Sequence, residues 1–402
     1  MVLKNNWCFL VLVFSIVSCQ NRTSTFDDSH VFRYNEHSNI TSLDPAFAKD
    51  QRNIWAVNQL YNGLVQLDDS LQVKPSIAKQ WDISEDGKVY TFFLRDDVYF
   101  HRHSLFGIDS TRLVTALDFE YSFHRLLDKN VASPGAWVLQ NVKNFSAISD
   151  RVFQIELKQT FPPFLGLLAM KYCSVVSREA IEYFGDEYRS NPIGTGPFQF
   201  KLWVENTKLV FRKNSDYFEI DDKGNQLPFL EAVSITFLPD KQSEFLQFIQ
   251  GNIDFMSSID ASYKDDLLTS EGKLTERYNT KIDMVSGPYL NTEYLGFNAT
   301  GKDKWVKLKA FRQAVNYCYD KENMIKYLRK GVGFPAVNGF IPKGLPPYAN
   351  RESKGYNYNP GKATSLLQEI DYQGQEVVLN TNETYKDMAL FIANEAEKVG
   401  LN

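Results

Sequence analysis

The stretch "NPIGTGPFQF", from Asn191 to Phe200, places Gly194 and Gly196 on either side of a threonine in the middle of the chain. Such a turn could expose backbone N–H groups to a phosphate. The phosphate-binding loop, however, requires a Lys and a Ser or Thr directly after its glycines, at the start of a helix. Here Pro197 and the residues "FQF" follow instead. We therefore predict a tight structural turn that leads into an extended segment.

On both sides of this turn the hydrophobic pattern changes repeatedly between helical and strand periods. The sequence predicts strands at 31–36, 208–218, 230–238, around Asp254 and Phe255, 292–299 and 376–381, and a hairpin over 81–100 that turns at Asp86–Gly87. It predicts helices at 46–61, 109–127, 164–184, 243–251, 311–331, 359–370 and 385–400. The first helix has its apolar positions at Ala46, Ile54, Val57, Leu60 and Tyr61, and Asn62–Gly63 ends it. This alternation indicates an α/β fold without internal repeats.

Composition excludes one class of partner. The 402 residues carry a net charge of -5, with acidic and basic side chains spread along the whole chain. No basic stripe suits a nucleic acid, so we expect none to bind.

The first residues have the layout of a secretory signal. Lys4 precedes the apolar run "WCFLVLVFSIV", and a polar segment follows it. Ser18 and Cys19 end the run, which resembles the signal of a bacterial lipoprotein, with Cys19 as the lipidated residue. A plain signal peptide that is cut elsewhere is the alternative. Of the remaining cysteines, Cys8 would leave with the signal, and we favour unpaired core positions for Cys173 and Cys318 over a disulfide bridge.

Catalytic motifs are not evident. The acid pairs at 68–69, 96–97, 221–222 and 265–266 are typical of solvated turns rather than of facing catalytic carboxylates. His101 and His103 in "FHRHS" would share one face of a strand, as a metal site could use, with Asp109 as a further ligand. An accidental pair at an exposed strand end is the favoured interpretation, since a tight site needs more ligands. We therefore expect that the protein is not an enzyme and that it binds no metal ion and no cofactor.

Several segments, in order, resemble the bacterial extracellular solute-binding proteins of family 5, which serve dipeptide, oligopeptide and nickel ABC transporters. Residues 43–101 are similar to a series that includes LDP, Y-x-GL and YTF-x-LR-x-x-V-x-F-H. "ALDFEYSFHRLLD" resembles the A-x-D-x-x-x-S-x-x-R-L-L helix, and "NPIGTGPFQF" the PVGTGPY turn. "FRQAVNYCYDKENMI", "GFPAVNGFIP" and "YNYNPGKATSLL" match later family segments. Where the family commonly has FHDG, this chain has "FHRHS".

The resemblance implies a type II periplasmic-binding-protein fold with two lobes and an extra inserted domain. The implied division is a lipoprotein signal at 1–18, a tether at 19–30, lobe I at 31–65 and 190–270, an inserted domain at 66–189, and an incomplete lobe II at 271–402. Chains of the family usually continue further and include a G-x-x-AD segment that is absent here. We therefore expect a truncated chain that lacks the C-terminal part of the lobes.

The resemblance also implies a function. The chain would be the substrate-binding component of an ABC importer that captures peptides between its lobes and delivers them to a permease. It would be a monomer in the periplasm or cell envelope, held to a membrane by its N-terminal lipid. The alternatives are a nickel or metal-chelate binder, a sensor or chaperone without a permease, and an enzyme. By position, the implied ligand contacts are Asn35, Glu36, Trp137, Phe297 and Asn298; a buried Glu36 would pair with an amine or a guanidinium.

Overall fold

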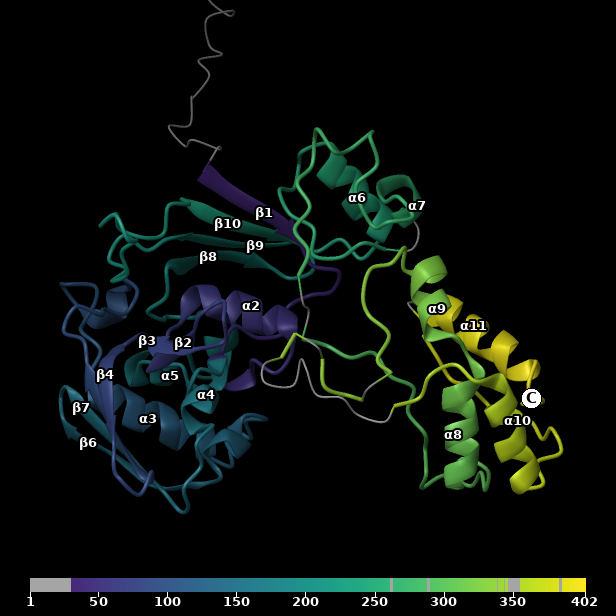
Figure 1. The fold of residues 1–402 in the computed structure, drawn as a ribbon. Helices are drawn as coiled ribbons and strands as arrows, with labels where there is room; N and C mark the ends of the chain where they lie inside the picture. Colours follow the sequence, from purple (N-terminus) through teal and green to yellow (C-terminus); the bar gives the residue numbers. More distant parts are fainter. Residues whose placement is uncertain are drawn as a thin grey trace, which may run out of the picture. The chain divides into compact units, whose positions relative to one another are not determined.

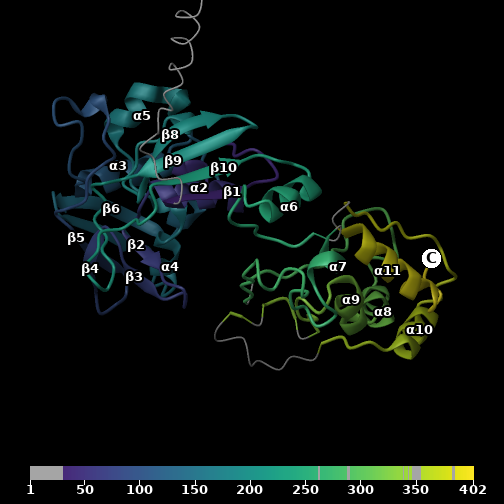
Figure 2. The same cartoon turned by 90° about the horizontal axis from the view of Figure 1, so that it is seen from above.

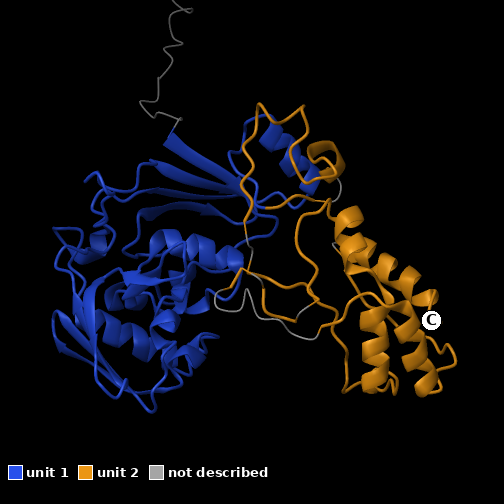
Figure 3. Cartoon of the chain, in the orientation of Figure 1, with its two compact units in different colours: residues 1–257 blue, residues 258–402 orange. Residues whose placement is uncertain are grey.

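A computed structural model describes residues 30–260, 263–287, 290–337, 339–342, 344–345, 355–382 and 385–402. The predicted signal segment, Cys19 and nearly all of the predicted tether lie outside these residues. The chain divides into two compact units, residues 1–257 and 258–402 (Figure 3). Among the residues described, no helix has the length and apolar character that crossing a membrane requires.

Unit 1 contains a four-stranded sheet in the order β1-β10-β9-β8 (Figure 1). Its strands are β1 (Val31–Asn35), β8 (Phe198–Val204), β9 (Lys208–Lys213) and β10 (Ala232–Thr236). β1 and β10 are parallel, whereas β9 is antiparallel to both β10 and β8. A parallel bridge between Tyr34 and Phe255 extends the sheet beyond β1. The predicted strands at 31–36 and 230–238 are confirmed, whereas the strand predicted at 208–218 ends at Lys213, after which a turn begins.

Helix α2 (Gln51–Leu60) lies against β8. It begins where the side chain of Asp50 accepts the N–H of Asn53, and its inward residues include Ala56, Val57 and Leu60. The predicted helix was too long at its start, because Ala46 belongs to a separate short turn, Pro45–Phe47, capped by Asp44. The carboxylate of Asp44 also forms a bidentate ion pair with the guanidinium of Arg125, with N···O distances of 2.9 and 2.6 Å.

A second sheet of unit 1 has the order β4-β5-β7-β6, and all of its neighbours are antiparallel. Its strands are β4 (Ala78–Ile83), β5 (Val89–Leu94), β6 (Val142–Ser149) and β7 (Val152–Leu157), and a two-stranded ribbon, β2 (Val65–Leu67) with β3 (Val73–Pro75), precedes it. The predicted hairpin is therefore confirmed, with Gly87 at a positive φ of 67° in its turn. Figure 2 shows the same elements from above.

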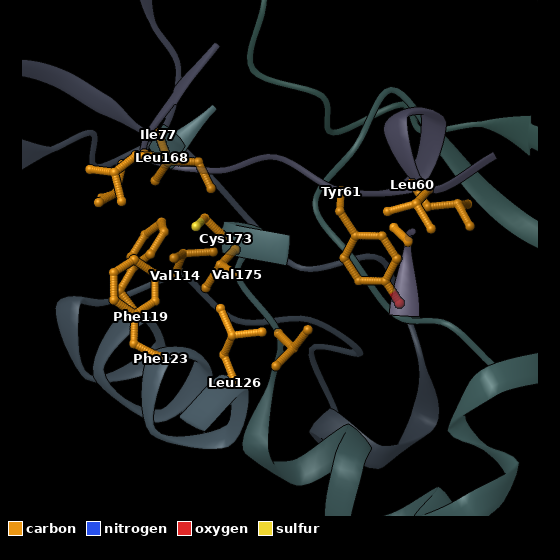
Figure 4. Packing of buried hydrophobic residues seen from close by; sticks show 14 of the residues in the cluster. Leu60, Tyr61, Ile77, Val114, Phe119, Phe123, Leu126, Leu168, Cys173 and Val175 are labelled. Atoms are coloured by element: carbon orange, nitrogen blue, oxygen red, sulfur yellow. The ribbon is translucent and has the colours of Figure 1, made fainter. Parts of the chain in front are cut away.

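Helix α3 (Ala116–Leu127) covers this second sheet at β6 and β7. It begins with a capping box in which Thr115 and Asp118 satisfy each other's backbone N–H groups. Phe119, Phe123 and Leu126 from α3 meet Cys173 and other buried side chains in the core (Figure 4). The predicted end of this helix at Leu127 is confirmed, but the predicted start near Ser110 is wrong, because Thr115 and Asp118 provide the cap and the helix begins at Ala116. Its period is explained by this buried face.

The single helix predicted over 164–184 is wrong. The structure has α4 (Phe164–Leu168), a short 3-10 turn at Lys171–Cys173, and α5 (Arg178–Phe184). Between them the chain is extended, because the N–H of Val175 donates to the carbonyl of Asn62 and that of Val176 to the hydroxyl of Ser122. These tertiary hydrogen bonds override the local helical pattern. Helix α6 (Lys241–Ile249) completes the unit and is followed by Gly251 at a φ of 76°.

The described part of unit 2 contains the helices α7 (Lys264–Leu267), α8 (Lys309–Cys318), α9 (Lys321–Leu328), α10 (Pro360–Glu369) and α11 (Lys386–Glu397), joined by long irregular segments. α8 packs against α10, and α11 against α8 and α9. The helix predicted at 311–331 is in fact two helices. Asp320 ends the first run by accepting the N–H groups of Glu322 and Asn323, which caps α9. The predicted helices at 359–370 and 385–400 are confirmed.

The strands predicted at 292–299 and 376–381 are wrong. A strand requires a partner for its backbone groups, and the described part of unit 2 has no ladder beyond an isolated bridge between Leu268 and Leu274. Val377 donates its N–H to Asn402, and Thr292 bonds to Phe340 through its side chain. The alternation of apolar residues therefore correctly indicated segments that are not helical, but these segments do not pair into a sheet.

The glycine turn is packed inside unit 1. The N–H of Gly196 donates to the carbonyl of Leu60 at 2.8 Å, and that of Gly194 to Nδ1 of His101 at 3.2 Å. Thr195 and Asn62 exchange two hydrogen bonds of 3.1 Å. Because protein acceptors take the N–H groups of both glycines, these groups are not available to an anion. The predicted structural role is confirmed, and so are Cys173 and Cys318 as buried, unpaired thiols.

Gly194→Ala should destabilise unit 1 by roughly 3 kcal/mol or more. A Cβ at this position would lie 1.9 Å from the carbonyl oxygen of Leu60, a contact that backbone must move to relieve. Gly166→Ala is the matched control, because no atom lies within 4 Å of its Cβ position in α4. The midpoint of urea unfolding measures both changes, and equal midpoints for the two variants would contradict this account of the turn.

Candidate functional site

The parallel strands β1 and β10 end at the same edge of their sheet. Such carboxyl edges are where open α/β sheets bind ligands. Asn35 and Glu36 stand at the end of β1, and Thr236 at the end of β10. The N–H of Glu36 donates to the carbonyl of Thr236 at 2.9 Å, so the pairing of the two strands continues one residue beyond Asn35, where β1 ends. This edge therefore brings two of the sequence-predicted contacts together.

Asn35 holds the two strand ends together. Its side-chain oxygen accepts the N–H of Leu238 at 2.7 Å and the hydroxyl of Thr236 at 3.2 Å. Its side-chain nitrogen donates to the carbonyl of Leu238 at 3.1 Å. Because both ends of the amide are engaged within the protein, Asn35 positions the edge.

Glu36 is different, because its carboxylate is buried without full compensation. The residue is only 7% exposed, and its Oε1 has no hydrogen-bond partner. Burial raises the pKa of Glu36 to about 7, while the positive charges of Arg52 and Lys241 oppose this shift and the nearby Glu244 and Asp50 add to it. A buried polar atom without a partner is costly, so Oε1 of Glu36 would gain stability from any donor that reaches it.

The first turn of α6 supplies the other charged groups at this edge. Asp240 caps the helix, and Lys241 and Glu244 follow within its first turn. Nε2 of His37 lies 3.2 Å from Oε2 of Glu244 and also contacts Nζ of Lys241. Sequence reasoning missed these three residues. The available signal was the order strand, cap, helix over 232–244, since a helix that begins directly after a strand presents its first turn at that strand's carboxyl end.

The other sequence-predicted contacts lie elsewhere. Trp137 belongs to a 3-10 turn of unit 1, Ala136–Leu139, and is 51% exposed, which fits a side chain available for contact. Phe297 and Asn298 lie in unit 2. Asn298 begins a tight turn in which its carbonyl accepts the N–H of Gly301 and its side chain the hydroxyl of Thr300. Phe297 is half-buried.

"FHRHS" does not form the expected strand end. His101 is 3% exposed, and both of its ring nitrogens bond to the glycine turn, Nε2 to the carbonyl of Gly196 and Nδ1 to the N–H of Gly194. Burial lowers its pKa to about 4, so the ring is neutral at pH 7. His103 caps a different turn by accepting the N–H of Leu105. No group of three or more metal-ligating side chains occurs within the described ranges.

Two open hollows also occur on unit 1. One, of about 350 Å³, is lined mainly by apolar side chains that include Phe198, Leu227 and Phe229. The other, of about 630 Å³, borders the ion pair between Arg102 and Asp216. Neither contains a sequence-predicted contact. We place the candidate site at the carboxyl edge of β1 instead, because the buried carboxylate of Glu36 there has an oxygen without a hydrogen-bond partner.

Comparison with known proteins gives the chain its relatives. Residues 72–402 match the family model described as bacterial extracellular solute-binding proteins, family 5 middle. Heme-binding protein A of Haemophilus influenzae is 30% identical over 369 residues, which cover 85% of this chain and 63% of that protein. The dipeptide-binding protein of Escherichia coli is 28% identical over 370 residues, with 85% and 65% covered. The chain thus spans just under two thirds of the length of these relatives.

Solved structures of periplasmic binding proteins are also similar to this chain. The ABC-transporter-associated periplasmic binding protein DppA of Helicobacter pylori, in complex with the peptide STSA, has a TM-score of 0.75 to this structure at 27% identity. The match covers 92% of this chain and 72% of that one. The expected α/β fold of the type II periplasmic binding proteins is therefore confirmed.

Glu36→Gln should change how stability depends on pH. Because the pKa of Glu36 is raised to about 7 in the folded state, between pH 4.5 and pH 7 the native protein holds a proton that the unfolded chain has released. Stability is therefore lost as the pH rises through this range. The variant avoids that loss, so its advantage over wild type should grow by roughly 2 kcal/mol between pH 5 and pH 8.

Urea unfolding at a series of pH values measures this difference. Glu182→Gln, which changes an exposed glutamate of α5, is the matched control and should follow the wild-type curve. Parallel curves for Glu36→Gln and wild type would contradict the burial account of Glu36.

Proposed function

The chain belongs to the bacterial extracellular solute-binding proteins of family 5, and we propose that it is the substrate-binding component of an ABC importer. It captures peptides in a cleft between two lobes and delivers them to a membrane permease. No bond is made or broken in this role; closure of the lobes encloses the ligand.

One observation within the chain supports ligand capture most directly: the buried carboxylate of Glu36, whose Oε1 lacks a partner at the carboxyl edge of β1. The relatives support the choice of peptide. One is named a dipeptide-binding protein, and one solved structure contains the peptide STSA. In this proposal the extended backbone of a peptide forms hydrogen bonds with main-chain groups, and hydrated pockets accept its side chains.

The proposed contacts divide into two kinds. Glu36 faces the ligand directly, and Asn35 positions it through its bonds to Thr236 and Leu238. Trp137 provides an exposed aromatic wall, and Phe297 with Asn298 provides the contacts of the second lobe. The exposure of Trp137 is compatible with such a wall.

The remaining parts of the proposal concern the whole protein. We retain the division into lobe I at 31–65 and 190–270, an inserted domain at 66–189 and lobe II from 271. Its support is that β1 joins a sheet with strands of 198–236, while the strands of 78–157 form a separate sheet. Cys19 carries a lipid that holds a monomer near its permease in the periplasm or cell envelope.

A metal chelate is the second candidate ligand, because one relative is named heme-binding protein A. It would occupy the same cleft and leave the role as a transporter component unchanged. The two candidates differ in what the protein should retain during purification.

Mass spectrometry should detect a ladder of short peptides released from the natural protein, produced without residues 1–19. Spectra of the native and the denatured protein are compared, and a protein treated with denaturant and refolded provides the ligand-free control. A heme or other metal chelate without peptides would contradict the peptide proposal. So would an empty protein that fails to bind a library of di- to pentapeptides by calorimetry.

A further inference from the structure

The surroundings of Glu36 contain an uneven set of charges. Tyr34, two residues earlier on β1, lies on the same face, and burial together with the charge of Glu36 raises its pKa. The residue that follows, His37, contacts α6. The charged groups from the two packed helices are Asp50 and Arg52 at the start of α2, and Lys241 and Glu244 in the first turn of α6.

Without Glu36, the positive and negative charges of these groups nearly cancel. Arg52 pairs with Asp50 at 3.7 Å, while His37 contacts both Lys241 and Glu244. When Glu36 is ionised and His37 is neutral, the carboxylates of Glu36, Asp50 and Glu244 outnumber the cations of Arg52 and Lys241 by one. One positive charge is therefore missing, and a proton on Glu36 can supply it.

We propose that Glu36 receives a cationic nitrogen group of the ligand, an ammonium or a guanidinium, in exchange for a proton. The inference deepens the proposed function and rests on it, since a ligand must reach this edge. The O–H bond of the protonated carboxyl breaks, the proton passes to water, and the cation donates N–H hydrogen bonds to Oε1. No covalent bond forms, and the charge of the cluster is unchanged by the exchange.

Geometry supports the exchange independently of titration. Oε1 of Glu36 is buried and has no partner, so a donor that enters gains a bond without displacing one. Charge-assisted hydrogen bonds are the strong ones in such surroundings. An uncharged group of the ligand would instead leave Glu36 protonated and would gain less binding free energy from its hydrogen bond.

The exchange predicts that affinity falls in acid. With the pKa of Glu36 at about 7, the apparent affinity for a cationic ligand should fall by about 30-fold between pH 8 and pH 5.5. In Glu36→Gln this pH dependence should largely disappear. Protonation of His37 would repel the cation in both proteins, so the comparison isolates the part that Glu36 carries.

Two measurements on the full protein test the proposal. First, ¹³C NMR follows the Glu36 carboxyl signal, assigned by its loss in Glu36→Gln, through a pH titration. Methylammonium or guanidinium chloride should lower its apparent pKa relative to equal tetramethylammonium chloride, which has no N–H donor. Second, calorimetry at pH 7 in buffers of different ionisation enthalpy counts the protons released when peptides bind.

The peptides distinguish the source of the cation. Trialanine offers an N-terminal ammonium, acetyl-Ala-Lys-Ala only a side-chain ammonium, and acetyl-trialanine neither. At pH 7 a carboxyl with a pKa of about 7 holds a proton about half of the time, so binding of one or both charged peptides should release about half a proton. This release should vanish in Glu36→Gln. Glu36→Asp, which keeps the charge but withdraws it by one methylene, is a second variant in case Glu36→Gln is poorly folded.

The outcomes separate this inference from the proposed function. Peptides that bind without proton release, and equally well to Glu36→Gln, would overturn the inference and leave peptide capture standing. A cation-dependent pKa of Glu36 without any peptide binding would retain the cation site and reject peptide capture. Identical titrations in all three salts, together with no release of protons, would overturn the exchange.

Discussion

The fold of unit 1 depends on a close approach of backbones that only glycine permits. Gly194 and Gly196 lie directly against the end of α2, where a Cβ would be 1.9 Å from the oxygen of Leu60 in one case and 2.5 Å from that of Gln59 in the other. The hydrogen bond from Gly196 to Leu60 and the two bonds to His101 fix the turn on both sides. β8 begins immediately after it.

This contact has consequences at the other end of α2. The helix is 10 residues long, and its C-terminus is held by the turn while its N-terminus carries Asp50 and Arg52 toward Glu36. On the far side of Glu36, the first turn of α6 follows β10 after a few residues and brings Lys241 and Glu244. The edge of the sheet is thus bounded by two helix starts, and burial between them raises the pKa of Glu36.

Local patterns predicted the elements that carry their own start and stop signals. The Asp86–Gly87 hairpin and the helix that begins at Pro360 were legible from sequence. The helix over 116–127 was predicted with the correct end but with its start several residues too early. Errors occurred where distant residues decide the backbone, as when Val175 bonds to Asn62 instead of continuing a helix. The strands of unit 2 failed because alternation reports a tendency and cannot supply a partner.

The candidate site was predicted in part. The family resemblance implied Asn35 and Glu36 by their position at the end of a strand, but their different hydrogen bonds are visible only in the folded chain. His37, Lys241 and Glu244 were missed because the pairing of β1 with β10 joins segments some 200 residues apart in sequence. His101 was misplaced on an exposed strand because nothing in "FHRHS" reveals that it supports the glycine turn.

The most direct test of the account is a crystal structure of the protein with its natural ligand retained through purification. We expect ligand density at the carboxyl edge of β1, with a nitrogen of the ligand within hydrogen-bonding distance of Oε1 of Glu36. Asn35 should keep its bonds to Thr236 and Leu238. A ligand held elsewhere, with Oε1 of Glu36 still buried and without a partner, would contradict the assignment of this edge as the binding site.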